Sequence, residues 1–150
     1  MSYKFSRCES QGQLRKIPVN TAYVKKEIIE AKRDLDSARK LLGSSEIKWA
    51  IVSSYYSMFH ACKSLLYYAG YEEKSHECVI IAIDELYVKK SLLSSDIIKN
   101  IQDAKTARET ADYGLTYGED SAKKVVADAE QVYVLITQYL MNLGVKISQG

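Results

Sequence analysis

One stretch of the chain, residues 44–70, is too apolar on every side to form a helix at the protein surface. Its charged residues are only Glu46, Lys48 and Lys63. A helix that is apolar around its whole circumference has to be surrounded by other elements. Ser44 or Ser45 can cap its start, and Gly70 can take the left-handed conformation that ends a helix. The rest of the chain is therefore expected to cover this central helix.

Four further segments carry apolar residues at the three- and four-residue spacing of amphipathic helices. They are residues 20–42, a segment that begins at Ser75, residues 96–113 and residues 120–143. The connection from the first of these to the central helix is about two or three residues long, which forces the pair into an antiparallel hairpin. No stretch shows the alternation of a strand. The sequence therefore predicts one all-α domain over residues 20–143, an antiparallel up-and-down bundle of about five helices.

The two ends of the chain lie outside this pattern. Residues 1–19 have no helical period and contain the single proline, Pro18. Their basic residues are Lys4, Arg7, Arg15 and Lys16, against one acidic residue, Glu9. They are expected to form a flexible basic N-terminal arm, which either has a role in binding or is a tail without a role. Residues 144–150 are expected to form a short C-terminal tail.

Composition excludes several classes of protein. A net charge of +2 is too small to indicate a nucleic-acid-binding protein, which needs a concentrated basic face. Three cysteines without a CxxC pair predict reduced thiols and no metal site. No apolar run reaches the roughly 18 to 20 residues of a membrane span, and no signal peptide is visible. A cytoplasmic protein without a membrane segment is therefore expected. No phosphate-binding glycine loop or metal motif suggests a cofactor.

Arg108 is the most unusual residue of the fourth predicted helix. It occupies a stripe that is otherwise apolar: Ile97, Ile101, Ala104 and Ala111. A guanidinium on such a seam needs a partner, because removing it from water without one is unfavourable. Three partners are candidates. The first is Asp112, one helical turn on, and the second is a carboxylate of another helix. The third is a phosphate bound through the planar guanidinium.

The two histidines differ in their surroundings. His60 lies between apolar residues of the central helix and is expected to be packed and hydrogen-bonded. His76 follows Ser75 at a helix start and is expected to touch solvent, where an imidazole can act as a base or bind an anion. A helix start also disfavours its cationic form. Most of the twelve tyrosines are expected to fill the core, but Tyr113 and Tyr117 flank a glycine-bearing loop near Arg108 and are candidate binding residues.

Three segments together resemble the HEPN family of small helical-bundle domains. They are SSYYSMFHACKSLLYYAG at residues 53–70, His76 at the head of the third helix, and ARETADYG at residues 107–114. The resemblance implies an HEPN-like homodimer in which the fourth helices face each other and bring two arginine motifs to a shared cleft. Many members are metal-independent RNases that use an Arg, four to six residues, and then a His. Others are the toxin half of a toxin-antitoxin pair with a minimal nucleotidyltransferase, commonly encoded nearby.

The sequence departs from the family motif at one position. The resemblance implies that the arginine of the motif corresponds to Arg108, but the position of the histidine falls at Tyr113 or just after it, and no histidine follows His76. Cleavage of RNA through its 2′-hydroxyl needs a base with a pKa near the working pH, and a tyrosine, with a pKa near 10, is a poor one. Whether the chain is an enzyme therefore stays open.

Three hypotheses follow from the resemblance. In the first, the domain is a dimeric module for a nucleotide, an RNA phosphate or a partner, with Arg108, Asp112 and Tyr113 lining the cleft. In the second, it is a metal-independent RNase toxin with an Arg-x4-Tyr motif, in which Arg108 stabilises the phosphorane and Tyr113 or His76 transfers the proton. In the third, Tyr113 or Tyr117 accepts a nucleotide from the partner.

Overall fold

The computed structural model describes residues 2–112 and 118–148 of the chain. The described elements are, in chain order, α1 (Tyr3–Ser10), β1 (Leu14–Lys16), α2 (Thr21–Gly43), α3 (Ile47–Tyr68), β2 (Tyr71–Glu73), α4 (His76–Ile83), η1 (Asp84–Val88), α5 (Asp96–Asp112) and α6 (Glu119–Asn142). The element η1 is a short π-helix that continues α4. Each strand has only three residues, so the predicted all-α fold class is confirmed.

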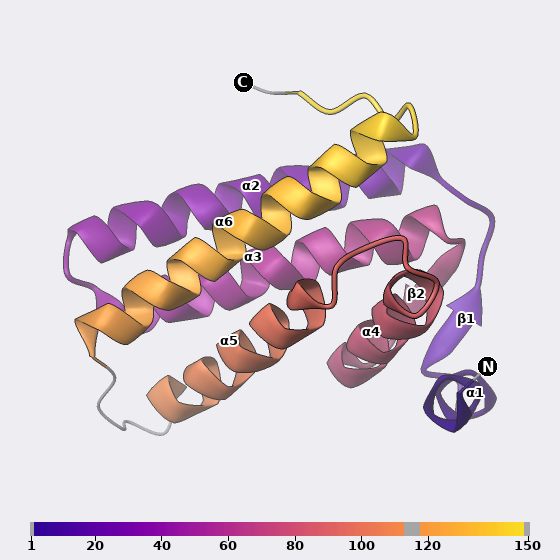
Figure 1. Cartoon of the computed structure of the whole chain (residues 1–150), viewed down its shortest axis with the longest axis horizontal. Coiled ribbons are helices and arrows are strands. Elements are labelled where there is room, and N and C mark those ends of the chain that lie inside the picture. The colour runs from indigo at the N-terminus through magenta and orange to yellow at the C-terminus, as the bar shows by residue number, and fades with distance from the viewer. Residues whose placement is uncertain (1, 113–117, 149–150) are drawn as a thin grey trace.

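Helix α3 lies at the centre of the bundle, with α2, α4, α5 and α6 packed around it (Figure 1). Helices α2 and α3 form the expected antiparallel hairpin, and α6 crosses over both of them. Most apolar side chains of α3 are buried: Ile51, Tyr55, Met58, Leu65 and Leu66 are at most 1% exposed, although Trp49 near the start of the helix is 52% exposed. The prediction of a surrounded central helix is therefore confirmed.

Side-chain caps begin helices α2 and α4. The Asn20 side chain accepts hydrogen bonds from the backbone N–H groups of the first turn of α2, and Ser75 accepts one from the Cys78 backbone at the start of α4. The predicted serine cap of α3 is wrong, because Glu46 occupies the N-cap position and makes no side-chain cap bond. The backbone N–H groups of Ser44 and Ser45 instead donate to the last carbonyls of α2, so these serines close the preceding helix.

Gly70 turns the chain from α3 into β2. Its φ is +82°, a conformation that side chains with a Cβ rarely adopt. A Cβ at this position would also lie 3.0 Å from the carbonyl oxygen of Ile17. The prediction that this residue needs a left-handed conformation is confirmed, and the close approach of β1 and its flanking residues adds a second reason for glycine.

The N-terminal segment differs from the expected irregular arm. Residues 3–10 form α1, and residues 14–16 form β1, which pairs antiparallel with β2. Phe5, Cys8 and Leu14 are at most 4% exposed and join the core. The helix was missed because it buries only two apolar side chains, and the strands because three residues are too few to show alternation.

The prediction of reduced cysteines is wrong for two of the three. Cys8 and Cys78 form a disulfide that ties α1 to α4, with a Cα–Cα distance of 5.9 Å. The two residues are 70 positions apart, so their contact depends on the position of the N-terminal segment, which the sequence did not show. Cys62 is a free, fully buried thiol whose pKa burial raises to about 12.

No helix among the described residues is both long and apolar enough to cross a bilayer.

The disulfide predicts a stability that depends on reductant. A cross-link of this loop length lowers the entropy of the unfolded chain and typically stabilises the folded state by about 2 to 4 kcal/mol. The double variant Cys8→Ser/Cys78→Ser should therefore unfold at lower denaturant concentration, by a loss in this range. Equilibrium unfolding in guanidinium chloride, followed by circular dichroism, measures it. Dithiothreitol should destabilise the wild type and leave the double variant unchanged; a wild type indifferent to reductant would contradict the cross-link.

Candidate functional site

Arg108 lies near the end of α5 and rests on two aromatic rings of α3. Its guanidinium carbon is 5.1 Å from the centre of the Tyr55 ring and 5.4 Å from that of the Tyr56 ring. Both distances fall within the range of cation–π attraction. The Arg108 side chain keeps 28% of its surface exposed, so the group is held in place without being enclosed.

Asp112 is the protein partner of Arg108, one of the candidates that the sequence left open. The Nε atom of Arg108 donates to Asp112 Oδ2 over 3.3 Å. Partial burial alone would lower the pKa of Arg108, but the bond to Asp112 and the two nearby phenols outweigh it and raise the pKa. Within residues 2–112 and 118–148, the two terminal guanidinium nitrogens make no other hydrogen bond or ion pair. Among the described residues, Asp112 is therefore the hydrogen-bonding partner of the Arg108 side chain.

His76, in the first turn of α4, also contacts Tyr55. Its Nδ1 atom is 3.1 Å from the Tyr55 hydroxyl, and its ring centre is 4.0 Å from that of Phe59. Partial burial and then the positive charge of Arg108 lower its pKa. Because a hydroxyl both donates and accepts, the bond to Tyr55 fits either neutral tautomer. With the proton on Nδ1, the outer nitrogen of the ring is a free base.

The structure thus brings three of the predicted site residues together: Arg108, Asp112 and His76. Tyr113 and Tyr117 lie outside the described residues. Tyr55 and Tyr56 were not predicted as site residues, because most tyrosines were expected to fill the core. Their adjacency was no signal of a site, because neighbouring residues of a surrounded helix can both be buried, as Leu65 and Leu66 are.

His60 belongs to a second group of charged residues. Its Nδ1 atom is 2.6 Å from Glu27 Oε2, which confirms the expectation of a hydrogen-bonded histidine. Burial alone would raise the pKa of Glu27, but the contacts with His60 and Lys63 outweigh burial and lower it. Lys63 also lies 3.7 Å from a carboxylate oxygen of Glu73. Glu27 of α2 thus pairs with His60 and Lys63 of α3, and these contacts help to stabilise the packing of the two helices.

The part of the chain that the structure describes contains no cluster of three or more His, Cys, Asp or Glu residues arranged to hold a metal ion. The Arg108 cluster, defined as Arg108, Asp112, Tyr55, Tyr56 and His76, presents a guanidinium, a carboxylate, an imidazole and two phenols.

Comparison with known proteins identifies the class to which this fold and this cluster belong. The HEPN domain matches residues 24–139, which is most of the chain and includes α3, α4, α5 and nearly all of α6. The chain therefore belongs to the HEPN family.

Relatives within this class are also found among named proteins. A protein of Methanocaldococcus jannaschii named "putative toxin" is 30% identical over 93 residues, 62% of this chain and 63% of its own length. The chain thus spans slightly less than two thirds of that protein. A UPF0332 protein of Archaeoglobus fulgidus is 31% identical over 69% of this chain and 83% of its own length. A UPF0332 protein of Thermotoga maritima is 28% identical over 79% and 96%.

The charge of Arg108 predicts a measurable effect on His76. Because a nearby cation disfavours a second one, the pKa of His76 should lie below its ordinary value of 6.5 in the wild type. Arg108→Gln, which removes the charge and keeps most of the side chain, should raise it. Proton NMR titration of the imidazole resonances measures both values, and His60→Gln assigns the two histidines.

Arg39→Gln is the matched control, since Arg39 lies on the surface of α2 beside Glu130. It should leave the pKa of His76 unchanged. The same pKa for His76 in the wild type and in Arg108→Gln would contradict an electrostatic contact between the two groups.

Proposed function

We propose that this HEPN domain binds a phosphate group of RNA or of a nucleotide at Arg108, as the toxin-like half of a pair with a partner protein. The observation that carries the proposal is the guanidinium within cation–π distance of Tyr55 and Tyr56, with the Asp112 carboxylate on Nε and no other partner for its terminal nitrogens among the described residues. A planar guanidinium donates two parallel hydrogen bonds to a phosphate.

The surroundings of Arg108 favour a nucleotide over an inorganic anion. Tyr56 is only half buried, and an exposed aromatic ring beside a cation offers a surface on which a base can stack. Asp112 belongs to the cluster, and Tyr113 and Tyr117 follow it in the sequence. We assign Asp112, Tyr113 and Tyr117, with His76, to ligand contacts around the phosphate.

The proposal includes a homodimer and a second protein. Membership of the HEPN family supports a pairing of two copies along α5, which would place two Arg108 clusters at one cleft. The relative named "putative toxin" supports a toxin-antitoxin setting. The partner we propose is a minimal nucleotidyltransferase encoded nearby.

Binding of RNA should depend on Arg108. Arg108→Ala should weaken binding of a fluorescein-labelled single-stranded RNA about tenfold or more, because charge-assisted hydrogen bonds to a phosphate are lost. Arg108→Lys should be intermediate, since an ammonium lacks the fork. Fluorescence anisotropy at fixed salt measures the affinities.

Arg33→Ala is the control for general loss of positive charge, because Arg33 is an exposed residue of α2 that pairs with Glu30. If Arg33→Ala and Arg108→Ala weaken RNA binding equally, Arg108 contributes only nonspecific electrostatic attraction, which contradicts a phosphate site at this residue. Light scattering of the same samples should give the mass of a dimer, and a monomer at all concentrations would remove the dimer from the proposal.

A second candidate function is a metal-independent RNase, favoured by the position of His76 beside Tyr55 and Arg108. In this reaction His76 takes the proton of a 2′-hydroxyl, the 2′-oxygen bonds to phosphorus, and the bond from phosphorus to the 5′-oxygen breaks. The leaving oxygen receives a proton, and Arg108 stabilises the charge that develops on the phosphorane. The imidazole would then replace the histidine that the family motif has at Tyr113.

The RNase hypothesis predicts cleavage in the presence of EDTA that Arg108→Ala and His76→Ala both abolish and Tyr113→Phe retains. His76 acts as a base only when it is neutral, so the cleavage rate should rise with pH and then level off. Because the pKa of His76 is lowered, the rate should level off at a lower pH than it would with an ordinary histidine of pKa 6.5. Gel analysis of RNA ending in a 2′,3′-cyclic phosphate measures the rate. Absence of cleavage by the wild type would leave the binding function as the better account.

A further inference from the structure

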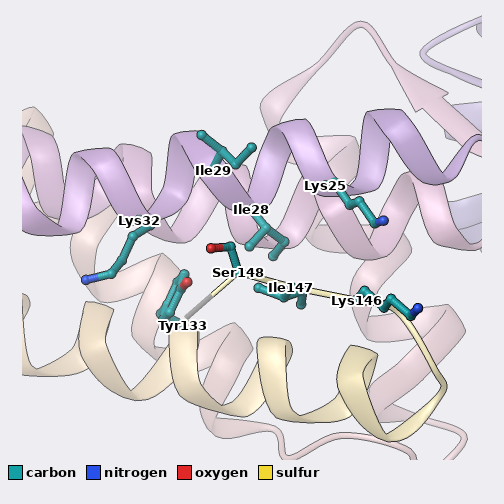
Figure 2. Close-up of a pocket in the computed structure, with 8 residues that line it drawn as sticks. All are labelled: Lys25, Ile28, Ile29, Lys32, Tyr133, Lys146, Ile147 and Ser148. Atoms are coloured by element: carbon teal, nitrogen blue, oxygen red, sulfur yellow. The ribbon is translucent and has the colours of Figure 1, made fainter. Parts of the chain in front are cut away.

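A pocket between α2, α6 and the residues that follow α6 has no connection with the Arg108 cluster. Figure 2 shows it with α2 on one side, α6 on the other and the chain after α6 passing between them. Its volume is about 320 Å³, which lies within the range of pockets that hold small molecules. None of the residues assigned to phosphate binding lines it.

The chain after α6 closes one wall of this pocket. Gly144 has a φ of +93° and turns the chain back, and the backbone N–H of Val145 donates to the Leu140 carbonyl over 3.0 Å. Val145 is buried, which anchors the segment. Ile147 then packs against the core from the edge of the groove. The wall is thus built by specific contacts rather than by a loose end.

The floor and one side of the pocket are apolar. Ile28 is 2% exposed and belongs to the core, whereas its neighbour Ile29 is 55% exposed. Ile147 and the ring of Tyr133, which rises from α6 toward α2 in Figure 2, complete the surface. An exposed isoleucine beside a preformed concave surface is apolar area that a ligand with a hydrocarbon part would cover.

Positive charge is concentrated at one end of the pocket. Lys25 and Lys146 lie at the same end in Figure 2, and Lys32 lies at the other, beyond Tyr133. Lys32 is paired with Asp36 over 2.9 Å. Over the described ranges, residues 2–112 and 118–148, neither Lys25 nor Lys146 has an ion pair. Two unpaired ammonium groups at the mouth of an apolar pocket attract an anionic head group.

We propose that this pocket binds a small amphiphilic anion, a hydrocarbon chain that carries a carboxylate or a phosphate. The acidic head lies between Lys25 and Lys146, and the chain runs over Ile29 and Ile147 toward Tyr133. The ligand comes from solution as a monomer, not from a bilayer. This site is independent of the proposed phosphate function, since it uses none of the same residues.

The test uses decanoate as the probe, below the concentration at which it forms micelles. Isothermal titration calorimetry should show saturable binding to the wild type, and Lys25→Gln/Lys146→Gln should weaken it about tenfold or more because the charge-assisted contacts are lost. Decanol has the same chain without the charge. Its affinity for the wild type should be no higher than the affinity of decanoate for this double variant. Lys40→Gln/Lys99→Gln is the matched control, because it removes two exposed lysines that do not line the pocket, and it should bind decanoate like the wild type.

A second variant tests the apolar part of the pocket. Ile29→Ser, at an exposed position where the fold does not depend on the side chain, should also weaken decanoate binding, and circular dichroism confirms that each variant is folded. The proposal is overturned by the absence of saturable binding, or by equal affinity in the wild type and Lys25→Gln/Lys146→Gln. It is also overturned if the protein cosediments with phosphatidylglycerol vesicles but does not bind monomeric decanoate.

Discussion

The apolar circumference of α3 is the constraint on which the rest of the structure depends. Because almost every side of this helix has to be buried, α2, α4, α5 and α6 are all placed by their contact with it. Tyr55 and Tyr56 show how this requirement also creates a site. Tyr55 is 1% exposed, whereas its neighbour Tyr56 is half-buried and lies beside Arg108 of α5. Arg108 of α5 then covers both rings at once.

Tyr55 connects Arg108 with His76 in this cluster. Tyr55 contacts the guanidinium of Arg108 with its ring and the imidazole of His76 with its hydroxyl. Burial raises the pKa of Tyr55, so the phenol keeps its proton and remains a neutral bridge. The positive charge of Arg108 disfavours a proton on His76. Helix α5 therefore supplies the cation of Arg108, and helix α4 supplies the imidazole of His76 with a lowered pKa. A cation can stabilise an anionic ligand, and a neutral imidazole can accept a proton from a hydroxyl next to it.

The sequence was informative where a residue's environment follows from local spacing. The buried faces of α2, α3, α5 and α6 repeat every three or four residues, and the caps at Asn20 and Ser75 follow from their position before an apolar run. Contacts between distant segments were not predictable in this way. Phe5 and Cys8 form too short a pattern to indicate α1, and nothing local indicates that Cys8 meets Cys78. The position of His76 beside Arg108 depends on the packing of α4 against α3, which no single segment encodes.

Helix α4 connects the missed part of the fold with the site. It has only eight residues, and isolated helices of this length are not stable in water, so its position has to come from outside contacts. Ser75 caps its first turn, Val79 and Ile83 are buried in the core, and Cys78 joins it to α1. His76 stands in the same turn as Cys78. The N-terminal segment therefore contributes to the site without containing any of its residues, because it helps to hold the short helix that presents the imidazole to Tyr55.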